Sequence, residues 1–274
     1  MTPQENRRVR IRALTGKDRR FYERQVDELD EANEWTSKIE RAWSVTTLLQ
    51  GEPKPALPYW SVKEGATFAV DNIAEVASLA KTDRDAAIDL IKRAPWRKRD
   101  KAANIGSTLH HVIEARTLGS DPNVPEDVES YIRQFDDWCS VYEPEWEALE
   151  VVIWNPDESY AGRLDAIATL GRLGGKRFLL DWKSGSGTYP SHAMQANLYA
   201  RAPLMFDDRT GIEAPMPDID GAAIVRISPD GWTFTEVNLS EDIYRAGLYC
   251  REMYRWMNET SKTAFTHEAE GSAR

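Results

Sequence analysis

Two neighbouring segments, AGRLDAIATL and KRFLLDWKS, each carry an acidic residue inside an apolar run that is typical of a buried strand. The glycine-rich turn GRLGG between them predicts a hairpin that brings Asp165 beside Asp181. Because side chains alternate along a strand, Asp181 and Lys183 are predicted to share one face while Trp182 points the other way. The fold must therefore accommodate two carboxylates and a lysine inside a largely apolar sheet.

The apolar residues around these acids predict which face of each strand is packed. Strict alternation places Leu164 and Ala166 opposite Asp165 and Ile167. On the second strand, the row opposite Asp181 consists of Phe178, Leu180 and Trp182. The charged residues thus interrupt an otherwise apolar pair of strands, where they need a partner or a metal ion.

The pairing of Asp165 with Asp181 has a chemical consequence, because adjacent carboxylates repel each other unless a proton or a cation lies between them. Their oxygen atoms suit Mg²⁺, with Mn²⁺ as a substitute, and the backbone carbonyl of Trp182 is a further expected ligand. A metal ion held there polarises a phosphodiester and activates water, which Lys183 is placed to orient. The pattern predicts metal-dependent phosphodiester hydrolysis. The alternative is a purely structural ion pair between Lys183 and Asp165.

The order of the remaining elements indicates an α/β fold with a mixed central sheet flanked by helices. The highly charged residues 1–40 are expected to form a helix, and residues 1–100 an N-terminal helical elaboration. Ser44 is expected to cap the short helix that follows it, and residues 261–274 to be a flexible tail. Within the expected core, residues 101–260, helices are predicted at 104–118, 125–141, 191–205 and 241–258, and strands at 148–155, 160–170, 176–184, 221–228 and 232–239.

A basic run, KRAPWRKRDK, contrasts with the net charge of −10 of the whole chain. A local basic patch is sufficient for an enzyme that contacts DNA at one groove. The alternative is a solvated helix end, and the arginines of RRVRIR near the N-terminus are a second basic candidate. The residues of the run expected to contact DNA are Arg93, Arg97, Lys98, Arg99 and Lys101.

Two helical motifs accompany the acidic strands. In GSTLHHVIE, His110 and Glu114 lie at i and i+4 and share one face of the expected helix. In QANLY, Gln195 and Tyr199 have the same spacing on the helix that follows the second strand. Gly162 stands three residues before the first aspartate, which makes a Gly-x-x-Asp pattern.

In this combination and order, the motifs resemble the PD-(D/E)XK nuclease superfamily, and specifically its RecB-like branch with the phage recombination exonucleases. WSVTTLL and KPALPYW are similar to the N-terminal segment of the phage members, so the resemblance covers residues 43–200. It implies a restriction-endonuclease-like core and a Mg²⁺-dependent DNA exonuclease that acts in recombination or repair. It further implies a metal-ligating His110, an outer ligand or catalytic Glu114, and catalytic roles for Gln195 and Tyr199 towards DNA or the metal-bound water.

The composition limits what else this resemblance implies. Two cysteines, Cys139 and Cys250, cannot supply the four thiolates of the iron–sulfur cluster that some relatives hold. A phosphate-binding Gly-x-x-x-x-Gly-Lys loop is absent from the sequence, so we expect no helicase motor. Neither a membrane-spanning run nor a secretory signal is expected, which predicts a cytoplasmic protein, in the host cytoplasm if phage-encoded.

Several functions remain open at the level of the sequence. The leading one is an exonuclease that resects duplex DNA ends and feeds a single-strand annealing recombinase. A structure-selective or nicking endonuclease on the same fold is the second, and a catalytically silent DNA-binding or assembly module the third. An enzyme that acts on RNA is a fourth. Cleavage polarity, strand preference, processivity and oligomeric state are not determined by these motifs.

Overall fold

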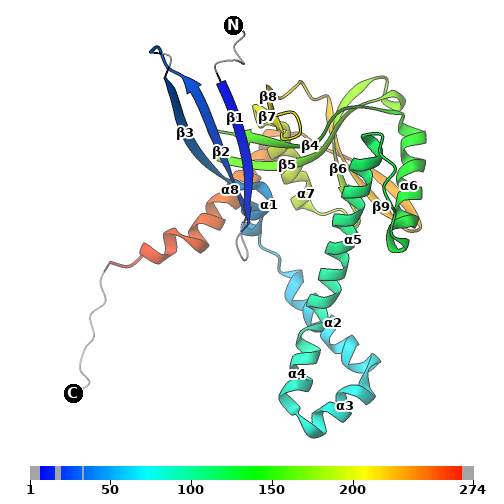
Figure 1. The fold of residues 1–274 in the computed structure, drawn as a ribbon. Helices are drawn as coiled ribbons and strands as arrows, with labels where there is room; N and C mark the ends of the chain where they lie inside the picture. Colours follow the sequence, from blue (N-terminus) through cyan, green and yellow to red (C-terminus); the bar gives the residue numbers. More distant parts are fainter. Residues whose placement is uncertain (1–6, 16–19, 33, 267–274) are drawn as a thin grey trace, which may run out of the picture.

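A computed structural model describes residues 7–15, 20–32 and 34–266, which form a ten-stranded mixed sheet with helices against both faces (Figure 1). The expected α/β class, with a mixed sheet flanked by helices, is confirmed. The strands are β1 (Arg7–Thr15), β2 (Arg20–Leu29), β3 (Trp35–Ser44), β4 (Pro144–Asn155), β5 (Tyr160–Leu170), β6 (Lys176–Lys183), β7 (Leu204–Asp207), β8 (Ile212–Pro215), β9 (Gly221–Ser228) and β10 (Gly231–Val237). The helices are α1 (Val45–Leu48), α2 (Ala56–Asp71), α3 (Ile73–Thr82), α4 (Arg84–Lys92), α5 (Ala94–Thr117), α6 (Glu126–Tyr142), α7 (Pro190–Ala200) and α8 (Glu241–Asn258).

The N-terminal segment corrects the sequence analysis, because residues 7–15, 20–29 and 35–44 form the antiparallel strands β1, β2 and β3 and not a helix. In β1 the charged residues alternate with Val9 and Ile11, which pack against a small apolar cluster. The outward Arg10 pairs with Asp27 of β2 at 2.5 Å. A period of two with cross-strand ion pairs is a strand pattern, and the high charge density concealed it.

The sheet curls until its two ends approach each other. Its main path runs β1-β2-β3-β5-β4-β7-β8, and Glu213 of β8 accepts hydrogen bonds from Arg7 of β1 and Arg24 of β2, each at 2.8 Å. Arg24 and Glu213 are both nearly buried, with 7% of each side chain exposed. The two ends of the path are therefore joined by a charged contact that is shielded from solvent.

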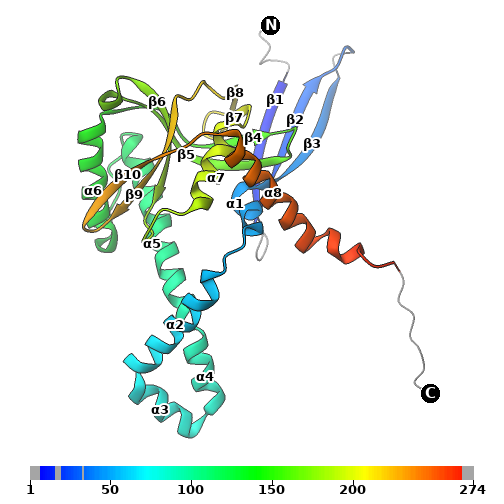
Figure 2. The same cartoon turned by 180° about the vertical axis from the view of Figure 1, so that it is seen from behind.

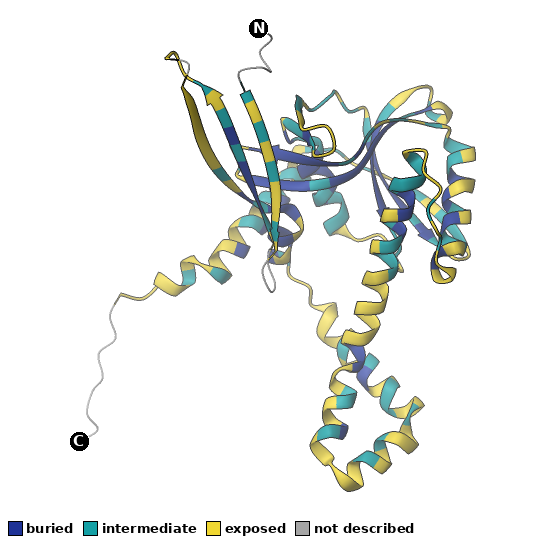
Figure 3. Ribbon diagram, in the orientation of Figure 1, coloured by how far each residue is buried: buried dark blue, intermediate teal, exposed yellow. Residues whose placement is uncertain are grey.

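The helices α2 to α4 and the first half of α5 form an arm that extends away from the sheet (Figure 1) and is mostly exposed (Figure 3), whereas the second half of α5 packs on the sheet. The helix expected at residues 104–118 is the second half of a longer α5, which ends shortly before Gly119. Helix α3 ends at Thr82 and α4 begins at Arg84, and the side chain of Asp83 between them caps α4 by accepting from the amide of Ala86 at 2.9 Å. The cap at Ser44 is confirmed, since its hydroxyl accepts from the amide of Thr47 at 3.1 Å.

The helices of the core hold the sheet between two layers. Helices α7 and α8 cover one face (Figure 2), where Leu179 packs with Leu198, and α5 and α6 cover the other, where Trp182 packs with Trp138. The helix expected over residues 191–205 ends at Ala200, and its last residues belong to β7. The strands expected at 221–228 and 232–239 and the last helix are confirmed within a few residues.

The central strand β5 is paired differently along its length. Its first residues, Tyr160 and Ala161, run parallel to the end of β3, whereas its last part, from Ala166 to Leu170, runs antiparallel to β6. Residues 162–165 lie between these two partners, so this edge of β5 is open at Asp165. The gap between β3 and β6 gives the side chains of neighbouring elements access to the middle of the sheet.

The expected alternation of β5 is wrong at this point. Leu164 packs in the same apolar cluster as Ile167, while Ala166 packs in the cluster on the other face. The neighbouring β4 makes the same change, from Leu149 to Val151. Both strands therefore exchange faces beside the gap.

The C-terminal segment is described only in part. Within the tail expected at residues 261–274, Thr260–Thr263 form a 3₁₀ turn, and residues 267–274 lie outside the described residues. None of the described helices has the length and apolarity needed to cross a membrane.

Candidate functional site

A pocket of about 240 Å³ lies at the gap between β3 and β6. Eight elements contribute to it: the strands β2, β3, β4, β5 and β6 and the helices α1, α5 and α7. Its lining residues are Arg20, Tyr22, Ser44, Thr46, His110, Glu150, Gly162, Arg163, Asp165, Asp181, Lys183, Gln195 and Tyr199. The pocket therefore joins residues from all three predicted motifs.

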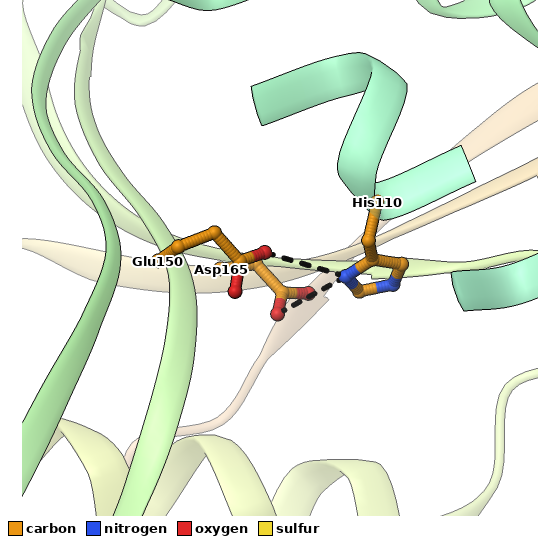
Figure 4. A group of neighbouring side chains, drawn as sticks. All are labelled: His110, Glu150 and Asp165. Carbon is orange, nitrogen blue, oxygen red and sulfur yellow. Dashed lines mark ion pairs between the residues drawn. The ribbon is translucent and has the colours of Figure 1, made fainter. Parts of the chain in front are cut away.

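Three side chains converge at the centre of this pocket (Figure 4). His110 reaches in from α5, and its Nδ1 lies 3.5 Å from Asp165 Oδ1 and 3.6 Å from Glu150 Oε1. One ligand atom of each of the three residues lies within 4.8 Å of the others. An imidazole and two carboxylates at this separation are a donor set that divalent metal ions accept.

The remaining polar side-chain atoms of Asp165 and His110 contact the backbone of Trp182, near the end of β6. The backbone amide of Trp182 donates to Asp165 Oδ2 at 2.7 Å, and the Trp182 carbonyl lies 3.2 Å from His110 Nε2. Burial opposes ionisation of Asp165, but His110, Lys183 and the Trp182 amide outweigh it and lower the pKa of this carboxyl. Burial likewise opposes protonation of His110, whose pKa is nevertheless raised well above its usual value by Asp165 and Glu150.

Asp181 and Lys183 project together from β6, as predicted. The Lys183 ammonium lies 2.5 Å from Asp181 Oδ2, so the lysine pairs with its own strand and the alternative pairing with Asp165 is not the one observed. Only 2% of Asp181 is exposed, and among the described residues neither of its carboxylate oxygens has a well-directed hydrogen bond. Burial raises the pKa of Asp181 to about 6, although Lys183 opposes that shift.

This donor set fits a hard divalent cation. Three carboxylates, from Glu150, Asp165 and Asp181, line one small pocket together with four basic side chains, Arg20, His110, Arg163 and Lys183. The poorly satisfied oxygens of Asp181 add buried acceptors that a cation would satisfy. Oxygen-rich sites with one imidazole are compatible with Mg²⁺ and Mn²⁺.

The helix α7 closes the pocket with the second predicted helical motif. Gln195 Nε2 donates to the hydroxyl of Tyr199 at 3.1 Å, and only 2% of Tyr199 is exposed. A Cβ atom on Gly162 would lie 2.5 Å from Tyr199 Cε1. The glycine of the Gly-x-x-Asp pattern thus has a packing reason, because any side chain there would displace the tyrosine ring.

Glu114 lies one turn after His110 on α5 and is partly exposed, but it is not among the residues that line the pocket. Its charge contributes to raising the pKa of Glu150, after the larger effect of burial. Glu150 is the pocket acid that the sequence analysis missed. Its signal was the same as that of Asp165, an acid inside the apolar run ALEVVIWN of β4.

The N-terminal strands supply two more pocket residues that the sequence analysis missed. Arg20 and Tyr22 come from the start of β2. The amide of Arg20 donates to Thr47 Oγ1 at 3.0 Å, and this hydroxyl donates back to the Arg20 carbonyl at 3.1 Å. Because the sequence predicts a helix over residues 1–40, it does not predict that the hairpin of β1 and β2 forms a wall of the site.

The residues expected to contact DNA lie on the arm, and the pocket lining contains none of these five. Arg97 packs over Phe68 at 4.8 Å, and the Lys98 ammonium lies 2.7 Å from Glu64. Arg99 stacks on Trp96 at 4.5 Å, a ring that is 55% exposed. The sequence-adjacent cluster is therefore a set of exposed side chains with local partners, outside the pocket itself. The full set is Arg93, between α4 and α5, and Arg97, Lys98, Arg99 and Lys101, all on α5.

Comparisons with known proteins give no family assignment. No family model matches the sequence, and no curated protein matches it. One solved structure with some similarity is described as "Crystal structure of SSO0001"; it has 16% sequence identity and a TM-score of 0.31, over 68% of this chain and 72% of that one. A TM-score of this size does not establish a shared fold.

Proposed function

We propose that this chain is a metal-dependent deoxyribonuclease, an exonuclease with a restriction-endonuclease-like core of the RecB-like kind. The observation that carries the proposal is the convergence of His110, Asp165, Asp181 and Lys183, from one helix and two strands, in a single pocket. Four ionisable groups of these types in one small pocket, with both aspartates less than 10% exposed, exceed what packing alone requires.

The residues that would hold Mg²⁺, or Mn²⁺ in its place, are His110, Asp165 and Asp181, with the backbone carbonyl of Trp182. When bound, such an ion polarises the scissile phosphate, lowers the pKa of a water molecule and stabilises the leaving oxygen. The Trp182 amide fixes one oxygen of Asp165 at 2.7 Å, which leaves its second oxygen facing His110. This hydrogen bond orients the carboxylate before any ligand arrives.

Lys183 has the position of a group that orients the attacking water or offsets charge on the phosphate. Its ammonium is held by Asp181, and the charges of Asp181 and Asp165 raise its pKa despite burial. It therefore stays protonated at neutral pH and acts as a cation and a donor. The Tyr199 hydroxyl, which accepts from Gln195, is a second donor at the same pocket and carries no charge.

DNA is proposed as the substrate because cationic and aromatic side chains occur on two surfaces. Arg20 lies at the pocket, and the arm carries Arg99 stacked on the exposed Trp96. Guanidinium groups bind phosphates and exposed aromatic rings stack on bases. Action from DNA ends, and cooperation with a single-strand annealing recombinase, remain proposals that rest on the resemblance of the motifs.

The experiment compares two DNA substrates of one sequence, a linear duplex and a covalently closed circle, in Mg²⁺ with the native protein and with Asp181→Ala. Degradation of the linear form alone, lost in the variant, is the expected result. Cleavage of the circle would favour an endonuclease. If neither DNA changes in Mg²⁺ or Mn²⁺, a silent DNA-binding module becomes the better account; the same assay with single-stranded RNA tests the ribonuclease alternative.

A further inference from the structure

Glu150 has an unusual backbone for a residue inside a strand. Its φ is 50°, in the left-handed region, which is disfavoured for any residue with a Cβ atom. Glu150 lies between two paired positions of β4 and β5, Leu149 with Ala166 and Val151 with Leu164, and is therefore level with Asp165. A conformation of this kind persists only where the surrounding structure enforces it, and such residues cluster at functional sites.

At the left-handed residue Glu150, the side chains of β4 change from one face of the sheet to the other. In a regular strand, residues two apart share a face, but Leu149 packs with the cluster under α5 and α6, and Val151 packs with the cluster under α7 and α8. Glu150 is the residue between them. Its carboxylate is thereby directed into the pocket, 3.6 Å from His110 Nδ1, with 15% of the side chain exposed.

The turn between β7 and β8 holds the backbone on both sides of this change. Arg209 Nη2 donates to the carbonyl of Leu149 at 3.0 Å, and Arg163 Nη1 donates to the carbonyl of Glu150. Arg163 belongs to β5 and Arg209 to the turn itself, and each guanidinium is held by an aspartate at the end of β7 or in the turn. Asp207 accepts from Arg209 Nε at 3.0 Å, and Asp208 accepts from Arg163 Nη2 at 2.7 Å. We call these four residues the backbone clamp.

A packing role alone does not explain a glutamate at this position. Glycine adopts the same φ without a Cβ penalty, and the glutamate places a charge beside Asp165 on a side chain that is only 15% exposed. His110 offsets part of this repulsion, but the same imidazole also faces Asp165. Two carboxylates that share one imidazole leave ligand capacity for a cation.

We infer that Glu150 is a ligand of the divalent ion in this pocket, together with His110 and Asp165, and that the backbone clamp positions its carboxylate. The inference rests on the proposed metal-dependent function, and it adds a side chain from β4 that the sequence motifs do not contain. It also gives the β7–β8 turn a role in the site, although Arg209 does not line the pocket.

The test is calorimetric titration of the metal-free full chain with Mn²⁺, with no DNA present. Glu150→Gln and Glu150→Gly are each expected to weaken Mn²⁺ binding by about tenfold or more. Glu150→Gly should melt at or above the temperature of the native protein, because glycine suits the backbone. This result would separate loss of a ligand from loss of the fold. Glu145→Gln is the matched control, an exposed glutamate of the same strand, and should bind Mn²⁺ like the native protein.

Asp165→Asn is the reference that separates this inference from the proposed function. If Asp165→Asn loses Mn²⁺ binding while both Glu150 variants keep it, Glu150 is not a ligand and the proposed metal centre stands without it. If the native chain itself binds no Mn²⁺, both the inference and the metal-dependent function are overturned.

The clamp is tested separately with Arg209→Ala, which removes the hydrogen bond to the Leu149 carbonyl. We expect Mn²⁺ binding to weaken severalfold, up to about tenfold, without direct loss of a ligand. Arg172→Ala, at an exposed arginine of another turn, is the matched control and should leave the affinity unchanged. Native affinity in Arg209→Ala would overturn the positioning role of the clamp.

Discussion

The pocket and the helical arm contain the same kinds of charged residues in opposite surroundings. In the pocket, Asp165 and Asp181 are 8% and 2% exposed and lie beside His110 and Lys183. On the arm, Lys98 is exposed and pairs locally with Glu64. An exposed ion pair of this kind contributes little to stability, whereas a buried acid with an unsatisfied oxygen is costly. Burial, and not the density of charge in the sequence, distinguishes the pocket that we propose as the reactive site.

The largest expected effect is that of Asp181→Asn, which keeps the shape of the side chain and removes its charge. Mg²⁺-dependent cleavage of linear DNA should fall by about 10³-fold, because electrostatic stabilisation at the reacting phosphate is lost. DNA affinity should be unchanged or higher, since a negative charge is removed. A cleavage rate within tenfold of the native value would place the chemistry elsewhere.

Lys183→Ala is expected to cost about 10²-fold or more in the cleavage rate, since a positioned cation and donor is lost from the pocket. Its control is Lys98→Ala on the arm, which also removes a lysine paired to a carboxylate. That control should leave the rate at saturating DNA unchanged. Equal rate losses in the two variants would contradict the contrast between pocket and arm.

Gly162→Ala tests the packing beneath the site. The new Cβ would lie 2.5 Å from Tyr199 Cε1, so the ring must move or the strand must shift. We expect the free energy of unfolding to fall by about 1–3 kcal/mol in urea denaturation. The control is Gly185→Ala, where an added Cβ meets no described atom within 4 Å. Equal stability of the two variants would show that Tyr199 relaxes freely.

The pH dependence of metal binding follows from two raised pKa values. Burial raises the pKa of Asp181 to about 6, and the pKa of His110 is raised well above its usual value by Asp165 and Glu150 despite its burial. Both groups must lose a proton to hold a cation, so Mn²⁺ affinity should increase as pH rises through 6 and beyond. Each displaced proton contributes about tenfold per pH unit.

The same two shifts act in the opposite direction on the metal-free fold. A group with a raised folded pKa stabilises the fold below its unfolded pKa, and this contribution is lost as pH rises through the folded value. The metal-free chain should therefore lose stability as pH rises from about 4 through 6 on account of Asp181.

The variant His110→Gln tests the contribution of His110 to the pH dependence of Mn²⁺ affinity. The increase in affinity at the higher pH values should be absent in this variant. A dependence of affinity on pH equal to that of the native protein would exclude His110 as a ligand.

The smallest expected effect is on the arm. Joint charge reversal of Arg97, Lys98 and Arg99 should weaken DNA binding by about tenfold and reduce the salt slope by about two to three. Fluorescence anisotropy at several salt concentrations measures both quantities. A salt slope equal to that of the native protein would mean that these side chains are a solvated surface with no DNA contact.

The strands that carry the aspartates were predictable because each is a short apolar run bounded by turn residues. The expected alternation of faces along β6 is confirmed, because Leu179 packs in one apolar cluster and Phe178, Leu180 and Trp182 pack in the other. The alternation of β5 was not predictable at Asp165, since the left-handed residue that accompanies the change of face is Glu150, on the neighbouring strand. A pattern read along one strand carries no information about such a change in its neighbour.

The N-terminal hairpin shows a different cause of failure. RRVRIR has the period of a strand, but the high density of charge in residues 1–40 favours an exposed helix in a prediction from composition. What stabilises β1 and β2 is distant in sequence: Arg24 and Arg7 meet Glu213 of β8. Long-range pairing of this kind is set by the fold and cannot be read from local propensity. Arg20 and Tyr22 were missed as pocket residues for the same reason.

The most direct test of the account is a crystal of the native protein soaked in Mn²⁺, with anomalous scattering measured at the manganese edge. The account predicts a peak in the pocket, bounded by His110 Nδ1 and the carboxylates of Asp165 and Glu150, and none on the arm. A pocket without manganese in crystals of protein that degrades DNA in Mn²⁺ would contradict the account, because cleavage would then depend on an ion bound elsewhere.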